Sequence, residues 1–377
     1  MAVGASATHF APWDDPNETA LIRIEHVTKK FGDFVAVDDI SLDIYRREFF
    51  ALLGPSGCGK TTLMRMLAGF ETPTSGKVVI DGQDVAGVPP NKRAVNMMFQ
   101  SYALFPHLSV WENIAFGLRR DGMPKDKIEA RVEEMLKLVQ LQQFAMRKPH
   151  QISGGQRQRV ALARSLAKAP KLLLLDEPLG ALDRKLREET QFELMDIQEK
   201  TGTTFVIVTH DQEEAMTVAS RVAVMDQGRL IQVATPAVIY ESPNSVYVAD
   251  FLGDATFFEG TVRKAGDAFE LTWAEGQPPI RAKSPHAFTD GQTAHYAIRP
   301  EKVEIHGDKP EDDNVMRGKI IDIGYLGNLS TYHVELANGQ IIKAQSFNTE
   351  RETRRRFTWD DEVWVNWTHS CGVLLEK

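Results

Sequence analysis

The fold of this chain is decided by the stretch Gly54-Pro55-Ser56-Gly57-Cys58-Gly59-Lys60-Thr61-Thr62. It follows an apolar run, Phe49–Leu53, and leads into a segment expected to be helical. A glycine-rich loop between a strand and a helix turns its backbone N–H groups toward phosphate oxygens, and the positive end of the helix adds to the attraction. In such a loop Lys60 would reach the β- and γ-phosphates of a nucleotide, and the Thr61 hydroxyl would bind Mg²⁺. The stretch therefore predicts a nucleotide site, in which Cys58 has no chemical part.

Two further apolar strands are expected to end in polar residues near this loop. Lys171–Leu175 runs into Asp176 and Glu177, and Thr204–Val208 is closely followed by His210. Short apolar strands separated by helices are typical of a buried parallel sheet, whose ligands bind at the carboxyl ends of the strands. Asp176 is placed to complete the coordination of Mg²⁺, and Glu177 to orient or deprotonate an attacking water.

A second anion site is indicated by Ser153, Gly154, Gly155 and Gln156, which precede a predicted helix that Pro170 closes. Ser153 is a favourable helix cap, and the two glycines allow a close approach of the backbone to an anion. Two anion sites about 100 residues apart are unusual in a monomer. They are explained if the second site of each chain closes on the nucleotide held by the other chain of a dimer.

The length and composition bound the remaining possibilities. The chain has 377 residues and a formal net charge of −8, and 42% of its residues are hydrophobic. This length predicts more than one domain, and the acidic balance disfavours a surface that follows nucleic-acid phosphates. No apolar run approaches the length of a membrane-spanning helix, and two cysteines suit a reducing compartment.

The periodicity changes along the chain. Residues 1–19 are acidic and rich in proline, which predicts a disordered tail rather than a secretory signal. Residues 20–253 alternate between strands and helices, and residues 254–377 read as seven short strands with a hairpin turn at Asn338-Gly339. A second hairpin turn is expected at Asp81-Gly82.

These motifs resemble the ABC transporter ATPases, and the resemblance covers about residues 20–377. The signature of that family is Leu-Ser-Gly-Gly-Gln, where this chain has Ile152 in the first place, and its D-loop usually begins with serine, where this chain has Gly180. The resemblance implies an α/β P-loop NTPase of the ABC type, with a mixed sheet and a helical subdomain. The C-terminal segment, with Ala297-Ile298-Arg299-Pro300-Glu301, resembles the transport-associated OB-like all-β domains of bacterial importers.

The same resemblance assigns roles to residues outside the phosphate loop. Gln100 would sense Mg²⁺ and the water and face the permease, and Asp183 would lie across the dimer interface. His210 would contact the γ-phosphate, and the Phe31 ring would stack on adenine, although Phe31 could instead be plain core. The aromatic residues next to Gln100 are expected either to dock a permease helix or to belong to the core; they are Phe99, Tyr102, Phe105 and Trp111, together with Leu104.

The resemblance also implies the machine that this chain serves. It is similar to ATPase subunits of polyamine importers, which implies ATP and Mg²⁺ as cofactors, a homodimer and two integral-membrane permease subunits. A periplasmic solute-binding protein would act through those permeases, and the chain would lie at the cytoplasmic face of the inner membrane. Iron, sulfate and sugar importers share this layout and stay as alternatives. A soluble ABC ATPase acting on nucleoprotein is the alternative of another class, and the single phosphate loop and acidic charge weigh against it.

Overall fold

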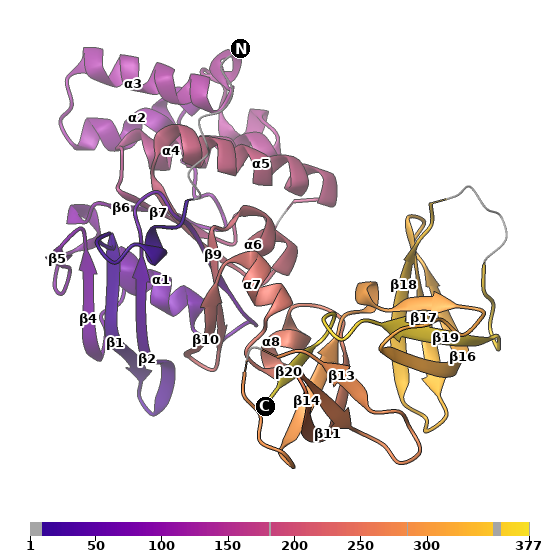
Figure 1. The fold of residues 1–377 in the computed structure, drawn as a ribbon. Helices are drawn as coiled ribbons and strands as arrows, with labels where there is room; N and C mark the ends of the chain where they lie inside the picture. Colours follow the sequence, from indigo (N-terminus) through magenta and orange to yellow (C-terminus); the bar gives the residue numbers. More distant parts are fainter. Residues whose placement is uncertain (1–9, 181, 285, 350–355, 377) are drawn as a thin grey trace, which may run out of the picture. The chain divides into compact units, whose positions relative to one another are not determined.

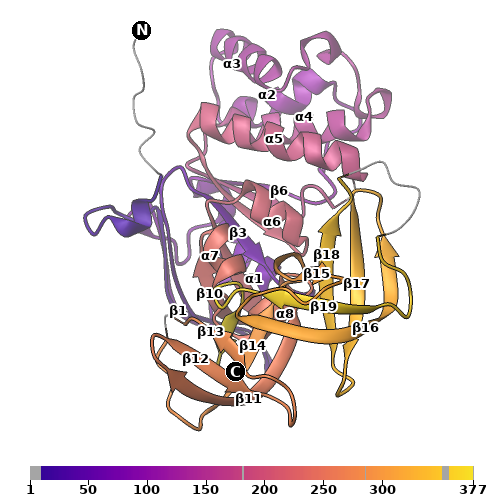
Figure 2. The same cartoon turned by 45° about the vertical axis from the view of Figure 1, so that its right-hand side comes forward.

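The computed structural model describes residues 10–180, 182–284, 286–349 and 356–376, which fold into two compact units, Met1–Pro236 and Ala237–Lys377. Figures 1 and 2 show both units as ribbons. Residues 1–9 of the predicted tail lie outside the described residues. The rest of the tail includes a 3-10 helix, Pro12–Asp14, and the Arg221 guanidinium lies 4.8 Å from the centre of the Trp13 ring.

The first unit is built on a six-stranded sheet, in the order β10-β9-β3-β8-β7-β6. Neighbouring strands from β9 to β6 are parallel, and β10 joins the edge in the antiparallel sense. Its strands are β3 (Phe49–Leu53), β6 (Val95–Met98), β7 (Leu172–Asp176), β8 (Thr204–Thr209), β9 (Arg221–Asp226) and β10 (Arg229–Ala234). β3 is buried along its whole length, which explains its uninterrupted apolar sequence and confirms the predicted buried sheet.

A second, antiparallel sheet of this unit has the order β2-β1-β4-β5. Its strands are β1 (Ile22–Phe31), β2 (Phe34–Ile44), β4 (Ser75–Ile80) and β5 (Gln83–Asp84). The predicted hairpin between β4 and β5 is confirmed: Ile80 pairs with Gln83, and both Asp81 and Gly82 have positive φ, as a tight hairpin turn requires. Apolar side chains of this sheet share one core with those of β3, β7 and β8.

The helices of the first unit fall into two groups, those that follow β3, β7 or β8 in the chain and those that come between β6 and β7. α1 follows β3 directly, α5 separates β7 from β8, and α6 follows β8; α2, α3 and α4 lie together as one group in both views (Figures 1 and 2). The helices are α1 (Lys60–Ala68), α2 (Val110–Arg120), α3 (Lys125–Leu138), α4 (Gly154–Ala167), α5 (Arg184–Thr201) and α6 (Gln212–Val218). Short 3-10 turns are Pro90–Lys92, Gln142–Phe144 and Pro149–Gln151.

The second unit begins with two short helices and continues as two five-stranded antiparallel sheets. Its elements are α7 (Pro236–Glu241), α8 (Val246–Phe251), β11 (Thr256–Ala265), β12 (Ala268–Thr272), β13 (Ile280–Ala282), β14 (Thr293–Ile298), the 3-10 turn Pro300–Lys302, β15 (Glu304–His306), β16 (Asn314–Tyr325), β17 (Leu329–Leu336), β18 (Ile341–Phe347), β19 (Glu362–Trp367) and β20 (Val373–Leu375). The sheets have the orders β13-β12-β11-β14-β20 and β15-β19-β16-β17-β18, and they enclose one core around Phe258, Tyr296 and Trp367.

The hairpin turn predicted at Asn338-Gly339 is present between β17 and β18, where Glu335 pairs with Ile341. The division between the units, however, falls at Pro236 rather than after Gly253. The reason is packing, because Ala249 of α8 is buried against Ala297 of β14 and Leu375 of β20. The helix α8, which continues the helical pattern of the α/β segment, therefore packs into the β unit.

Candidate active site

The phosphate loop lies between β3 and α1, at the carboxyl end of the parallel sheet. Its glycines are required by the backbone: Gly57 and Gly59 have φ of 82° and 105°, a region that disfavours residues with a Cβ. A Cβ on Gly59 would also lie 2.3 Å from the carbonyl oxygen of Ala36. The backbone at Ala36 therefore approaches the loop too closely for any side chain at Gly59, and Thr61 and Thr62 follow in the first turn of α1.

Lys60 is buried, with its side chain folded back over the loop that precedes it. Its ammonium donates to the carbonyl oxygens of Gly54, at 2.6 Å, and Pro55, at 2.8 Å. The Cys58 sulfur also accepts from it at 3.6 Å, and burial raises the pKa of the Cys58 thiol. A buried ammonium in the concavity of a glycine-rich loop provides one positive charge for a polyphosphate.

Three predicted residues from separate segments meet at one carboxylate. Glu177, directly after β7, accepts a hydrogen bond from Gln100 Nε2 through Oε2 at 3.0 Å. Its other oxygen, Oε1, lies 3.0 Å from His210 Nδ1. The Glu177 backbone has φ of 43° and its N–H donates to the carbonyl oxygen of Val208, which anchors it to β8. The end of β7 is therefore bound to the loops that follow β6 and β8.

Asp176 is the last residue of β7 and is half-buried. Burial, reinforced by the adjacent Glu177 charge, raises the pKa of the Asp176 carboxyl, and Arg65 and Lys60 oppose that change. A divalent cation would favour the ionised form. Within the described residues no group of three or more His, Cys, Asp or Glu side chains could hold a metal by itself. The donors fit Mg²⁺ held by one carboxylate, one hydroxyl and the phosphates of a nucleotide.

The second predicted anion site forms the N-terminus of α4, as expected. Ser153 Oγ accepts from the Gln156 N–H at 3.2 Å, and Gln156 Oε1 accepts from the Ser153 N–H at 2.9 Å, which is a reciprocal cap. Gly154 and Gly155 are the first two residues of the helix. Asp183 likewise caps α5 by accepting from the Leu186 N–H at 3.0 Å. In the described part of the chain, these side chains bond only within their own helix ends, away from the phosphate loop.

Phe31 ends β1 and is 47% exposed, with the Lys29 ammonium 4.7 Å from the ring centre. This exposure excludes the reading of Phe31 as a core residue. It leaves an aromatic face available for stacking.

A polar cluster at the start of α6 was not predicted from the sequence; it is made of Thr209, Asp211, Glu214 and Arg187 of α5. Glu214 is only 2% exposed. One feature of the sequence could have indicated Glu214: this carboxylate comes directly before the apolar Ala215, on a helix that begins next to His210.

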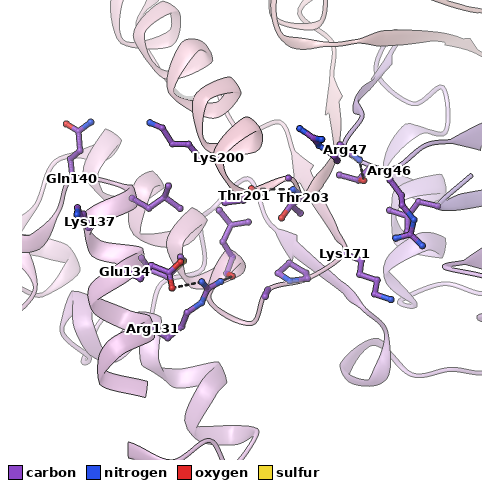
Figure 3. A pocket seen from close by; sticks show the side chains of 18 residues that line it. Arg46, Arg47, Arg131, Glu134, Lys137, Gln140, Lys171, Lys200, Thr201 and Thr203 are labelled. Atoms are coloured by element: carbon purple, nitrogen blue, oxygen red, sulfur yellow. Dashed lines mark hydrogen bonds and ion pairs between the residues drawn. The ribbon is translucent and has the colours of Figure 1, made fainter. Parts of the chain in front are cut away.

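A cavity of about 870 Å³ lies at the other end of the same sheet (Figure 3). Residues before β3, β7 and β8 line it, together with the ends of α3, α4 and α5, so it faces the amino ends of the strands. Three of its cations make contacts within the fold: Arg131 donates to the carbonyl oxygens of Leu166 and Ala167, and Arg46 and Lys171 share Asp81. The cavity is separate from the candidate active site.

Comparison with known families agrees with this geometry. Residues 37–180 match the ABC transporter family, and residues 296–375 match the TOBE domain family. No helix among the described residues has the length and apolar character needed to span a membrane.

Related proteins match along nearly the whole chain. The putrescine transport ATP-binding protein PotG of Escherichia coli K12 is 53% identical over 94% of this chain and 95% of its own. The spermidine/putrescine import ATP-binding protein PotA of Rubrobacter xylanophilus is 51% identical over 94% of each chain.

Two solved structures share the fold of the first unit. One is cbiO1 of Clostridium perfringens, part of the ABC transporter complex cbiONQ, with a TM-score of 0.56, 31% identity and coverage of 59% of this chain and 91% of its own. The other is a dimeric ATP-binding cassette in a post-hydrolysis state bound to ADP and Pi, with a TM-score of 0.51, 33% identity and coverage of 57% and 98%. Together with the phosphate loop and the residues gathered at Glu177, these matches show that the chain belongs to the ABC transporter family of ATP-binding proteins.

Proposed function

We propose that this chain is the ATP-hydrolysing subunit of an ABC importer and that it drives the uptake of polyamines. The ATPase assignment rests on the Glu177 carboxylate. Gln100 and His210 bind it at the carboxyl end of the strands, beside the phosphate loop. That arrangement aligns a proton acceptor with two residues able to sense the group being transferred.

The chain's own residues supply most of the reaction. The loop N–H groups and the Lys60 ammonium bind the phosphates, which lowers the cost of the negative charge that accumulates during transfer. Glu177 orients water and accepts its proton as the oxygen attacks the γ-phosphorus. The bond between the γ-phosphorus and the oxygen that links it to the β-phosphorus breaks, leaving ADP and inorganic phosphate. His210 would hold the γ-phosphate, and Gln100 would position the water.

Thr61 and Asp176 would hold Mg²⁺, with Gln100 beside them. The ion, when bound, neutralises charge on the β- and γ-phosphates. The raised pKa of Asp176 supports this assignment, because a carboxylate that burial disfavours in its charged form gains from a nearby cation.

A second copy of the chain would complete the site. The Ser153 N–H is already bonded to Gln156 Oε1, whereas Gly154 and Gly155, the first residues of α4, are partly exposed. Among the described residues, no carboxylate is hydrogen-bonded to the N–H groups of these two glycines. We place these donors, with Asp183, on the nucleotide held by the second copy. The dimeric relative bound to ADP and Pi supports this arrangement.

The polyamine substrate rests on the relatives, whose names specify putrescine and spermidine transport at 53% and 51% identity over 94% of the chain. Permease subunits in the membrane, and through them a solute-binding protein, would be the partners, so the chain would act at the cytoplasmic face of the membrane. The permease would dock at the aromatic stretch beside Gln100. None of its five side chains is buried, and Phe99 is 38% exposed.

The variant Glu177→Gln tests the ATPase assignment. It is expected to bind ATP with near-normal affinity and to form a dimer with ATP, while steady-state turnover falls by at least about a hundredfold, the range typical of a lost general base. Turnover, nucleotide affinity and sedimentation of the full chain would be measured together. Normal turnover in this variant would exclude Glu177 as the base.

A further inference from the structure

We infer that Glu214 is a positioning residue for His210, acting through the side chain of Thr209 in a closed ring of hydrogen bonds. The inference rests on the proposed ATPase function and adds to it a residue that does not touch the nucleotide.

The hydrogen bonds of this ring hold the residue before His210 and the residue after it. The Thr209 hydroxyl donates to Glu214 Oε2 and accepts from the Asp211 N–H at 2.9 Å, so it spans His210. Asp211 Oδ1 then accepts from the Glu214 N–H at 3.1 Å and caps α6. The neighbours of His210 on either side are therefore fixed to the same buried residue, which leaves the imidazole as the projecting group.

The ring is attached to the rest of the unit by Arg187. Its Nη1 donates to Asp211 Oδ2 at 2.7 Å, and its Nη2 donates to the carbonyl oxygen of Leu182 at 3.2 Å. Leu182 immediately precedes Asp183, the cap of α5. The position of His210 is thereby linked to the helix end that carries the proposed cross-dimer contact.

Glu214 suits this purpose because it is neither exposed nor paired with a cation. It is 2% exposed, and its Oε1 is buried without a hydrogen-bond partner in the described structure. Burial raises the pKa of Glu214 to about 7, against the lowering effect of the Thr209 hydrogen bond; the Asp211 charge adds to the rise, and Arg187 and His210 oppose it. A carboxyl that can stay neutral anchors Thr209 without placing a full negative charge beside Glu177 and His210.

The experiment compares Glu214→Ala with Glu214→Gln in the full chain, measuring kcat, KM for ATP and melting temperature. We expect Glu214→Ala to lower kcat on the order of tenfold, as loss of a supporting hydrogen bond to a site residue commonly does. KM should change by less than about twofold, because Glu214 contacts no nucleotide. Glu214→Gln should retain kcat, because its amide oxygen still accepts from Thr209.

The matched control is Glu48→Ala, which removes another fully buried glutamate, paired with Arg221 before β3. It should lower the melting temperature while retaining kcat. If Glu214→Ala lost no more kcat than Glu48→Ala at a similar loss of melting temperature, Glu214 would be purely structural and the inference would be wrong. Should Glu214→Ala fail to fold, Thr209→Val breaks the same contact from the other side and must reproduce the kcat loss.

A double-mutant cycle identifies the route of the effect. In a His210→Ala background, Glu214→Ala should cause no further loss of single-turnover rate, because the residue through which it acts is gone. Independent, multiplying losses would overturn the positioning role. A wild-type chain without ATPase activity would instead refute the proposed function itself, which keeps the two failures distinct.

Discussion

At the scale of single residues, the chain places charged groups where burial changes their chemistry. Lys60 and Glu214 are both buried in the first unit, but their surroundings differ. The Lys60 ammonium is bonded to two loop carbonyls, whereas Glu214 has one hydroxyl donor and one oxygen without a partner. Ionisation of Glu214 therefore carries a cost that its one hydroxyl donor does not offset.

This cost predicts a pH dependence of stability. The pKa of Glu214 rises from 4.5 to about 7 on folding, so the unfolded chain loses this proton first as the pH increases. Stability from this group is complete below pH 4.5 and is lost as the pH rises toward 7. Glu214→Gln should therefore become more stable relative to the wild type across this window, by on the order of 3 kcal/mol.

Urea denaturation of both proteins at several pH values would measure that difference. The exposed Glu189→Gln on α5 is the control and should follow the wild type at every pH. A difference between Glu214→Gln and the wild type that stays constant with pH would contradict the prediction.

Residues at strand ends were predictable, and the groups behind them were not. Asp176, Glu177 and His210 follow apolar strands, and parallel strands bring their carboxyl ends together, so their meeting follows from the pattern. Gln100 came from the family resemblance, and the structure places it at Glu177. Glu214 escaped prediction because its role depends on a helix folding back beside β8, which no local pattern in the sequence specifies.

At the scale of elements, Arg131 joins α3 to the end of α4. Its Nε and Nη2 donate to the carbonyl oxygens of Ala167 and Leu166 at 2.9 and 3.0 Å, and Nη1 donates to Glu134. These carbonyls belong to the last turn of α4, where helical N–H partners run out, although the Leu166 oxygen also accepts from the Ala169 N–H at 2.9 Å. The guanidinium thus supports a helix end and a helix contact together.

Arg131→Met should destabilise the chain by about 1–3 kcal/mol, because carbonyl groups lose charged donors while the aliphatic packing is largely kept. Thermal denaturation of the full chain would show the loss as a lower melting temperature. Arg184→Met is the matched control: its partner Glu188 is one helical turn away, both side chains are exposed, and little change is expected. Equal effects of the two substitutions would show that Arg131 contributes no more than a surface pair.

Element prediction did not simply follow strand length: the two-residue β5 was predicted beside its hairpin turn, whereas the six-residue β9 and β10 were not predicted. The five apolar residues Phe49–Leu53 form β3 as predicted, whereas β13, β15 and β20, each of three residues, were not predicted. Such strands are held by pairing with distant partners, as Leu375 is with His295 of β14. Their alternation is too brief to be read locally.

At the scale of the whole molecule, composition and motifs gave two domains but placed their division after Gly253. The helical pattern of α8 looks like a continuation of the α/β segment, yet Ala249 is buried against strands that come later in the chain. Packing between segments far apart in the sequence decides the division, and periodicity does not contain that information.

The proposed transport function makes a prediction for the assembled machine. Putrescine should leave the ATPase rate of the isolated chain unchanged, since none of the proposed nucleotide contacts involves a solute. In vesicles that also contain the permease and binding protein, putrescine should raise the rate. Phosphate release with putrescine, sulfate or maltose in parallel would decide among the importer classes, and stimulation by sulfate or maltose alone would contradict the polyamine assignment.

The double contact at Glu177 has a consequence for how variants of this protein are interpreted. A carboxylate has only acceptors, so it can accept from Gln100 and from a His210 Nδ1–H at once. A glutamine amide has one acceptor oxygen and one NH₂ donor, so the same position would set two donors against each other or force one neighbour to turn over. Glu177→Gln therefore alters the hydrogen bonds to Gln100 and His210 as well as removing a base, and a conformation trapped with that variant carries both changes.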